Sequence, residues 1–352
     1  MASQFFQLKV ATIRYETEDA VRIGFKVPKE IQSLFAFDPG QYLTISLTID
    51  GERVRRAYSI CSATHEAIIS FLVKRVEGGL VSNYLNDHVK IGDRIDVLAP
   101  NGHFKVSIQD KKNNYFFFGA GSGITPLVSM IGSILEKEPD SHCHLLYGNR
   151  DEANIIFKSK LDRLALVYQD RFQVKYILSR PKNNWQGQTG RVDTKSIDRF
   201  LKVSNHPVDG YFICGPGAMI EAAYDGLLEL GVAKDKVHRE YFSAPLPKGD
   251  ETIATVEREL ITSKVQVVLD KKQYDLLIDD ETDIVHALLN KNIEPPYSCL
   301  SGTCSTCKAK LVEGDMYMDV SIGLEDDEKE AGYILTCQAH PLTESVKIDF
   351  DQ

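Results

Sequence analysis

Four cysteines near the C-terminal end of the chain have a spacing that could hold a metal centre. Cys299, Cys304, Cys307 and Cys337 form the pattern C-x4-C-x2-C-x29-C. This is the plant-type spacing of [2Fe–2S] ligands, in which four thiolates hold two iron ions. The loop sequence SCLSGTCSTC supplies Gly302 and small hydroxyl residues, which let backbone N–H groups turn toward the sulfurs. The pattern therefore predicts an iron–sulfur cluster bound by these four cysteines.

Two other interpretations of the cysteines stay open at this point. A structural zinc site usually has two pairs of ligands with a few residues inside each pair, whereas Cys337 stands alone. Unrelated buried cysteines are the second alternative, and Cys61 and Cys143, which lie in apolar sequence, are expected to be ordinary core residues. The 7 cysteines of the chain are too few and too uneven for a disulfide scaffold.

A glycine-rich turn, GAGSGITP at residues 119–126, follows the apolar stretch YFFF and precedes a helical pattern. Gly119, Gly121 and Gly123 would let the backbone approach a pyrophosphate, whose negative charge the N-terminus of the helix would stabilise. The G-x-G-x-G spacing departs from the Rossmann G-x-G-x-x-G, so this turn alone is weak evidence for a dinucleotide.

Two short motifs in the N-terminal part are consistent with a second phosphate-containing cofactor. Arg56-Ala57-Tyr58-Ser59 forms R-x-Y-S, and Gly79-Leu80-Val81-Ser82 follows in a turn. A glycine turn can present backbone N–H groups to a phosphate. Taken alone, an Arg, a Tyr and a Ser in a strand are more often surface residues, so these motifs depend on their context.

The elements around these motifs indicate more than one domain. Residues 1 to about 105 contain β-branched or aromatic stretches separated by turn signals, which favours an antiparallel barrel. From about residue 110, strands alternate with helical segments, which is typical of a doubly wound parallel sheet. Residues 243–260 are polar and contain two prolines, which indicates a linker. A hairpin, a helix and the cysteine loop follow it.

The excess negative charge lies entirely in the last quarter of the chain. Residues 261–352 contain 8 Lys and Arg against 18 Asp and Glu, while the whole chain has a net charge of −9. This distribution argues against nucleic acid binding and for a separate acidic module. The acidity could keep the module soluble or steer a basic partner toward it. In the second case, electron-transfer rates would fall with ionic strength.

No apolar run approaches the length of a membrane span, and the N-terminus MASQFFQLKV does not resemble a secretion signal. We therefore expect a cytoplasmic protein that does not bind membranes.

The motifs together resemble one known family. PYSCLSGTCSTCKAKLVEGD and EAGYILTCQAHP are similar to the ferredoxin domain of plant-type reductases. The R-x-Y-S motif, the glycine turn and Cys214-Gly215-Pro216-Gly217 are similar to the ferredoxin–NADP reductase superfamily. The resemblance covers nearly the whole chain and extends to the reductase components of bacterial oxygenases, including those of phenylacetyl-CoA epoxidases.

This resemblance implies three domains. They are an antiparallel β-barrel flavin domain at 1–107, an α/β NAD(P)-binding domain with a doubly wound parallel sheet at 108–245, and an α+β β-grasp [2Fe–2S] domain at 261–352, with a linker at 246–260. It also implies that Cys299 and Cys304 bind one iron, and that Cys307 and Cys337 bind the other. FAD is favoured over FMN by the resemblance, although the residues themselves separate the two poorly.

The resemblance further implies roles for individual residues. Arg56 would contact the flavin phosphates, Tyr58 would pack on the isoalloxazine, and Ser59 would hydrogen-bond near its N5. Gly79 and Ser82 would hold the pyrophosphate. The remaining implied residues belong to the nucleotide side: the turn from Gly119 to Thr125, Cys214 and Gly215 beside the nicotinamide, and Phe242 near the flavin. Tyr58, Ser59 and Cys214 are the expected catalytic residues.

The choice between NADPH and NADH depends on which residues meet the 2′ position. A 2′-phosphate requires cationic partners, whereas the ribose of NAD usually meets a carboxylate. Two expected strands end in Arg150 and in Ser179-Arg180, and family members that use NADPH carry such a Ser-Arg pair. Asp151, a carboxylate next to Arg150, weakens the case for NADPH. NADPH is favoured and NADH stays open.

The order of motifs predicts a chain of redox carriers from NAD(P)H through FAD to a [2Fe–2S] cluster. Flavins accept a two-electron hydride and release electrons singly, as an iron–sulfur cluster requires. No segment of the chain resembles an oxygenase active site, so a separate oxygenase is the expected electron acceptor. A redox-sensing protein and a general reductase for several oxidases are the alternatives.

Overall fold

The computed structural model describes residues 4–244, 262–279 and 281–352. Residues 6–54 and 58–242 belong to one unit, and the described residues at 4–5, 55–57 and from 243 onward belong to a second. The predicted linker at 246–260 lies outside the described residues, and the domain limits stay predictions. Within the described ranges, no helix has both the length and the apolar character needed to cross a bilayer.

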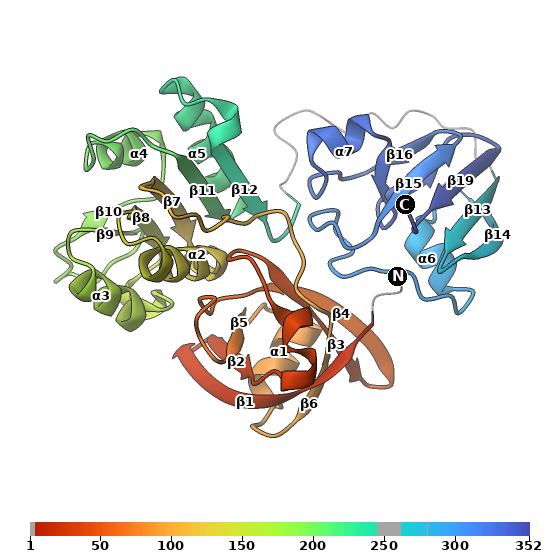
Figure 1. Ribbon diagram of the computed structural model, residues 1–352, viewed down its shortest axis with the longest axis horizontal. Coiled ribbons are helices and arrows are strands. Elements are labelled where there is room, and N and C mark those ends of the chain that lie inside the picture. Colours follow the sequence, from red (N-terminus) through yellow and green to blue (C-terminus); the bar gives the residue numbers. More distant parts are fainter. Residues whose placement is uncertain (1–3, 245–261, 280) are drawn as a thin grey trace. The chain divides into compact units, whose positions relative to one another are not determined.

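The N-terminal part is an antiparallel barrel, as predicted (red to orange in Figure 1). Its elements are β1 (Phe6–Thr17), β2 (Ala20–Phe25), β3 (Tyr42–Ile49), β4 (Glu52–Ser59), β5 (Ile69–Lys74), α1 (Leu80–Asp87) and β6 (Arg94–Val97). The strands pair in the order β4-β3-β6-β1-β2-β5. Just after β4, Ile60 forms an antiparallel bridge with Phe71 of β5, which closes the sheet on itself. This closure leaves fewer unpaired edges and encloses an apolar core.

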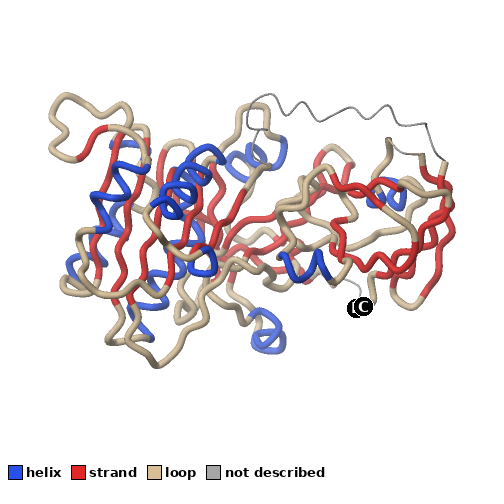
Figure 2. The backbone as a smooth tube through the Cα atoms, turned by 90° about the horizontal axis from the view of Figure 1, so that it is seen from above, coloured by secondary structure: helices blue, strands red, loops and turns tan. Residues whose placement is uncertain are grey.

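The middle part is a six-stranded parallel sheet, also as predicted. Its strands are β7 (Asn114–Ala120), β8 (His142–Asn149), β9 (Phe172–Leu178), β10 (Gln188–Thr189), β11 (Gly210–Gly215) and β12 (Val237–Tyr241). They lie side by side in the order β10-β9-β8-β7-β11-β12. Figure 2 shows strands of this sheet (red) running side by side with helices (blue) beside them. The strand order reverses between β7 and β11, where open α/β sheets place their ligands at the carboxyl ends of the strands.

Four helices cover the two faces of this sheet (Figure 1). They are α2 (Ile124–Lys137), α3 (Lys158–Val167), α4 (Thr194–Leu201) and α5 (Gly217–Glu229). Successive residues of β7 point to opposite faces, so Phe117 packs with α2 and α3, whereas Phe116 and Phe118 pack with α4 and α5. The continuous aromatic run of β7 therefore reflects a strand that is buried on both faces.

The C-terminal part combines a mixed sheet with one packed helix. Its elements are β13 (Ser263–Leu269), β14 (Lys272–Ile278), α6 (Ile284–Leu289), β15 (Lys308–Glu313), β16 (Met316–Met318), α7 (Asp326–Glu330), β17 (Tyr333–Leu335), β18 (Ala339–Pro341) and β19 (Ser345–Asp349). The larger sheet has the order β14-β13-β19-β15-β17, and Ile284 and Leu288 of α6 join its core. The cysteine loop lies between α6 and β15 and is thereby anchored at both ends.

Candidate functional site

The R-x-Y-S motif lies at the end of β4. The Tyr58 ring packs against the ring of Phe71, with 5.3 Å between the ring centroids, and its residue is half-buried. Ser59 is buried and Arg56 is exposed, with its guanidinium donating to the Arg55 carbonyl at 2.7 Å. Because alternate side chains of a strand point to opposite faces, Arg56 and Tyr58 lie on one face of β4 and Ser59 on the other.

The second phosphate-binding candidate is the turn before α1. The Ser82 hydroxyl accepts from Val76 N at 3.1 Å and donates to the Gly79 carbonyl at 3.3 Å. A Cβ at Gly79 would lie 2.6 Å from Ser82 Oγ, so this turn requires glycine. Helix α1 has no side-chain N-cap, and its first N–H groups can therefore serve an anionic ligand. These residues fit a flavin pyrophosphate.

Ser59 contacts the carboxylate of Glu240, a residue of the nucleotide sheet, and Cys214 of the same sheet lies near the same carboxylate. The Ser59 hydroxyl donates to Glu240 Oε2 at 3.1 Å, and Cys214 Sγ lies 4.0 Å from the same oxygen. Cys214 ends the buried part of β11 and Glu240 lies beside it on β12, where the two are register partners. Two of the three predicted catalytic residues, Ser59 and Cys214, thus both contact Glu240, to which the sequence analysis assigned no role.

Burial is the main influence on these ionisable groups. It raises the pKa of Glu240 to about 8, although the Ser59 hydrogen bond lowers it. The Glu240 residue as a whole retains some exposure, but its carboxyl end points at Ser59 and Cys214. Burial also raises the pKa of Cys214 well above its ordinary value, and the Glu240 charge adds to this effect. Both groups therefore hold their protons near neutral pH.

The raised pKa of Glu240 predicts a pH-dependent stability. Between about pH 4.5 and pH 8 the unfolded chain releases this proton while the folded chain retains it, so stability falls as pH rises. One such group contributes a slope of at most about 1.4 kcal/mol per pH unit. In guanidinium unfolding at pH 6 and pH 8, Glu240→Gln should lose less stability than the wild type. Equal losses in both proteins would contradict the assignment.

The glycines of the nucleotide turn are needed for different structural reasons. A Cβ at Gly123 would lie 2.1 Å from the carbonyl oxygen of Cys214, so this glycine allows the turn to pack closely against the end of β11. Gly121 has φ +55° and open space around its Cα, and its carbonyl accepts from the Tyr147 hydroxyl at 2.8 Å. Gly121 therefore provides access for a ligand, while Gly123 provides close packing. Thr125 donates to the Ser122 carbonyl at 2.8 Å and stabilises the same turn.

Gly123→Ala should therefore destabilise the protein through a steric clash. Overpacking of this kind costs about 1–3 kcal/mol. Ser122→Ala changes the neighbouring residue, whose side chain makes no hydrogen bond within the described part of the chain, and is the matched control. Chemical unfolding of both variants measures the difference. If Gly123→Ala is as stable as Ser122→Ala, the proposed packing role is wrong.

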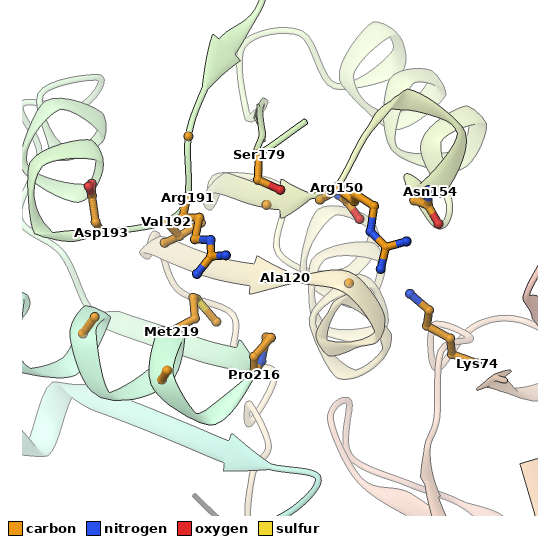
Figure 3. Close-up of a pocket in the computed structure, with 16 residues that line it drawn as sticks. Lys74, Ala120, Arg150, Asn154, Ser179, Arg191, Val192, Asp193, Pro216 and Met219 are labelled. Carbon is orange, nitrogen blue, oxygen red and sulfur yellow. The ribbon is translucent and has the colours of Figure 1, made fainter. Parts of the chain in front are cut away.

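A pocket of about 680 Å³ opens beside this turn at the carboxyl ends of the strands (Figure 3). Gly121, Arg150 and Ser179 line it, as the sequence led us to expect for a nucleotide site. Lys74 and Arg191 add two further cations, and Figure 3 shows the side chains of Lys74 and Arg150 directed toward one another. A pocket with three cations suits the phosphates of a dinucleotide.

Other predicted nucleotide residues lie outside the lining of this pocket. Arg180, Gly119, Gly123, Thr125, Cys214 and Gly215 are not among its lining residues. Asp193 lines the pocket, but its carboxylate accepts from Ser196 N at 2.8 Å as the N-cap of α4. That carboxylate is therefore already engaged in capping α4. Phe242, the residue that follows β12, is 43% exposed.

The four predicted cluster ligands lie close together. Cys299, Cys304 and Cys307 belong to one loop, and Cys337, which follows β17, lies against this loop. The Cys299 thiol is hydrogen-bonded to the thiols of Cys304 and Cys337, and Cys337 is also bonded to Cys307. Cys299 is partly exposed, whereas the other three are buried. No group of three His, Cys, Asp or Glu side chains in the described ranges is arranged around a single metal ion. The fit to a cluster depends instead on the four neighbouring sulfurs and on the loop that surrounds them.

The loop is shaped by close backbone packing. Gly302 has φ +68°, and a Cβ there would lie 2.6 Å from the Val320 carbonyl. The Ser301 N–H donates to Cys299 Sγ at 3.4 Å, and the Thr306 hydroxyl lies 3.6 Å from Cys304 Sγ. Gln338 donates to the Leu300 carbonyl at 3.2 Å and fixes the start of the loop. The Ser301 N–H, already directed at the Cys299 sulfur, fits a [2Fe–2S] cluster, whose sulfur it would stabilise.

The barrel, the parallel sheet with its cationic pocket and the four-cysteine loop together define a class: an oxidoreductase with separate flavin, nicotinamide and iron–sulfur domains. Models of known families match all three parts. The oxidoreductase FAD-binding domain matches residues 7–106, the oxidoreductase NAD-binding domain matches 117–225, and the 2Fe-2S iron-sulfur cluster binding domain matches 267–342.

The relatives identify the family within this class. One component of the 1,2-phenylacetyl-CoA epoxidase from Escherichia coli is 37% identical over 351 residues, which is 99% of this chain and 98% of that protein. The ferredoxin reductase component of 3-ketosteroid-9-alpha-monooxygenase from Rhodococcus rhodochrous is 34% identical, with 97% of this chain and 96% of that protein covered. The chain belongs to the family of oxygenase reductase components that unite FAD-binding, NAD-binding and [2Fe–2S] domains.

Solved structures show the same fold. Phthalate dioxygenase reductase aligns over 98% of this chain and 98% of its own, with a TM-score of 0.62 and 24% identity. A ferredoxin NADP+ reductase from Neisseria gonorrhoeae aligns over 69% of this chain and 100% of its own, with a TM-score of 0.58 and 20% identity. The three domain families and the oxygenase reductase relatives show that the protein is an NAD(P)H-dependent flavin and iron–sulfur oxidoreductase that passes electrons onward.

Proposed function

We propose that this chain oxidises NADPH and delivers the electrons to a separate oxygenase of the phenylacetyl-CoA epoxidase type. The observation that carries this proposal is the 37% identity to the Escherichia coli epoxidase component along nearly the full length of both chains. The 3-ketosteroid and glycine betaine monooxygenase reductases are less similar, at 34% and 29% identity. The alternative is a general reductase that serves several oxidases. The reconstitution experiment below distinguishes the two.

The residues of the chain divide the work in this proposal. A bound flavin would accept a hydride and release electrons one at a time to the cluster. Tyr58 would provide a surface for the flavin ring, and the Gly79–Ser82 turn would hold its phosphates. Ser59 would donate a hydrogen bond near the reacting nitrogen, with Glu240 behind it as a proton reservoir. Support for this last role comes from the 3.1 Å Ser59–Glu240 contact and the pKa of about 8.

NADPH is proposed because the pocket is rich in cations. Lys74, Arg150 and Arg191 line it together with the Ser179 hydroxyl, whereas its one carboxylate, Asp193, already caps a helix. Arginines bind phosphate with paired, charge-assisted hydrogen bonds. We assign Arg150, Ser179 and Arg191 to the 2′-phosphate. Arg180, which the family resemblance also implied, lies outside the pocket lining.

Separate substitution of the two arginines should change nucleotide preference. Arg150→Gln and Arg191→Gln are each expected to lower kcat/KM for NADPH by about tenfold or more, since a charge-assisted bond contributes about 1.5–3 kcal/mol. Values for NADH should stay within a factor of two. Arg180→Gln is the matched control and should change neither. Steady-state reduction of cytochrome c with both nucleotides makes the comparison. Equal losses of kcat/KM with NADPH and NADH would indicate that these arginines bind the pyrophosphate and not the 2′-phosphate.

The partner proposal is tested by reconstitution. The purified, cofactor-loaded chain is mixed with the other components of a phenylacetyl-CoA epoxidase, with phenylacetyl-CoA and NADPH. Oxidation of NADPH should become dependent on the thioester and on the oxygenase components. If cytochrome c is reduced rapidly while the epoxidase components receive no electrons, the reductase chemistry stands and the proposed partner is wrong.

A further inference from the structure

A second large groove lies away from the nucleotide pocket, and no step of the proposed electron transfer uses it. It has a volume of about 790 Å³ and is lined by residues of β1, β2, the segment 63–70, α2 and α3. We call it the seam groove, because its walls come from both the barrel and the parallel sheet of one unit. The seam is fixed nearby by the Ser129 hydroxyl, which donates to the Ser62 carbonyl at 2.7 Å, and by Thr64 N, which donates to Ser133 Oγ at 3.0 Å.

The seam groove carries more positive than negative charge. Its lining includes the cations Arg14, Arg22, Lys160 and Arg163, the carboxylates Glu16 and Glu66, and the imidazole of His65. Two cations are paired: Arg22 Nε lies 3.0 Å from Glu16, and Lys160 Nζ lies 2.8 Å from Glu66. For Arg14 and Arg163, the described part of the chain provides no side-chain hydrogen bond or ion pair. Two guanidinium groups thus remain for an external anion.

The strand register makes this charge arrangement unfavourable without a ligand. Arg14 of β1 and Arg22 of β2 are direct cross-strand partners, so their side chains share one face of the sheet. Like charges opposite each other destabilise a strand pair, and Glu16 compensates only one of these two. The first turn of α3, with Ser159 and Lys160, lines the opposite wall and adds the partial positive charge of a helix N-terminus.

We propose that the seam groove binds a small polyanion that carries at least two phosphate or carboxylate groups. Arg14 and Arg163 would bind it from opposite walls, and arginine forks suit both kinds of acid group. The volume falls within the range of pockets for small organic ligands. None of the groove residues lines the nucleotide pocket, so this is a separate binding site and is independent of the NADPH assignment.

Isothermal titration of the cofactor-loaded protein tests the proposal, with inorganic pyrophosphate and citrate as probes at constant ionic strength. Arg14→Gln and Arg163→Gln should each weaken binding by about tenfold or more. Arg150→Gln removes a cation of the nucleotide pocket, and Arg199→Gln removes an exposed cation of α4. Neither control should change the affinity of this site. The Arg163, Arg150 and Arg199 variants should keep the thermal midpoint of the unliganded protein, because these side chains are exposed. Arg14→Gln should raise it slightly, because it removes the like charge opposite Arg22.

The two probes distinguish the sources of the anion. Variant-sensitive binding of pyrophosphate alone supports a phosphorylated ligand, and variant-sensitive binding of citrate supports a polycarboxylate. The proposal is overturned if neither probe binds, or if Arg150→Gln alone removes the binding, which would place the probe in the nucleotide pocket. It is also overturned if Arg199→Gln weakens binding as much as the groove variants do, because the interaction would then be non-specific.

Discussion

Replacing Cys307 with alanine is expected to abolish electron delivery to cytochrome c while NADPH still bleaches the flavin absorbance. Cys307 is buried, and its thiol is hydrogen-bonded to that of Cys337. Removal of one of four thiolates leaves an iron ion incompletely coordinated, so the cluster should not assemble. Tyr58, Ser59 and the residues of the nucleotide pocket lie in a different unit of the chain and should remain functional. Absorbance spectra, iron content and cytochrome c reduction are the measurements.

Cys143→Ala is the matched control for this experiment. Cys143 is also fully buried, but it belongs to the core beneath the parallel sheet. This variant should retain the iron content and the cytochrome c activity of the wild type. If Cys307→Ala keeps a full complement of iron, or if it still reduces cytochrome c at the wild-type rate, the four-cysteine assignment is wrong.

The second large effect is expected at Glu240. Glu240→Gln keeps the shape of the side chain and its acceptor for Ser59, but it cannot exchange a proton. Loss of a positioned acid–base group typically costs about a hundredfold in rate. We expect stopped-flow reduction by NADPH, or the following transfer to the cluster, to slow by about ten- to a hundredfold. The wild-type rate should change with a pKa near 8, and this transition should be absent in the variant.

Glu229→Gln serves as the control, because Glu229 is exposed at the end of α5 and contacts neither Ser59 nor Cys214. Its rate and pH profile should match the wild type. A Glu240→Gln variant with an unchanged pH profile would assign Glu240 a structural role only, whatever its effect on the absolute rate.

The sequence was sufficient to predict the three domain folds. Apolar alternation and turn residues marked the barrel, and the aromatic run before the glycine turn marked the central strand β7. Short elements gave weaker signals. The hairpin turn at Asp270 and Lys271 adopts positive φ without the glycine or asparagine that usually indicates such a turn. Strand β10 has only 2 residues, too few to show any periodicity.

The functional residues were predictable where they lie close together in the chain. Three of the four cysteines occupy one loop, and their spacing carries the chemistry. Glu240 was not assigned a role, because a single glutamate in a strand has no distinguishing pattern until the fold places it beside Ser59. Lys74 and Arg191 were missed for the same reason, since the pocket collects them from β5 and from the segment after β10. Such residues could be found only from their spatial arrangement.

The central claim is that electrons pass from the nicotinamide nucleotide through the flavin to the cluster within this one chain. An anaerobic titration of the loaded protein with NADPH, and separately with NADH, tests it by visible absorbance and electron paramagnetic resonance. We expect NADPH to bleach both the flavin and the iron–sulfur bands and to produce the signal of a reduced [2Fe–2S] cluster. A fully loaded protein whose flavin and cluster both stay oxidised with either nucleotide would contradict it.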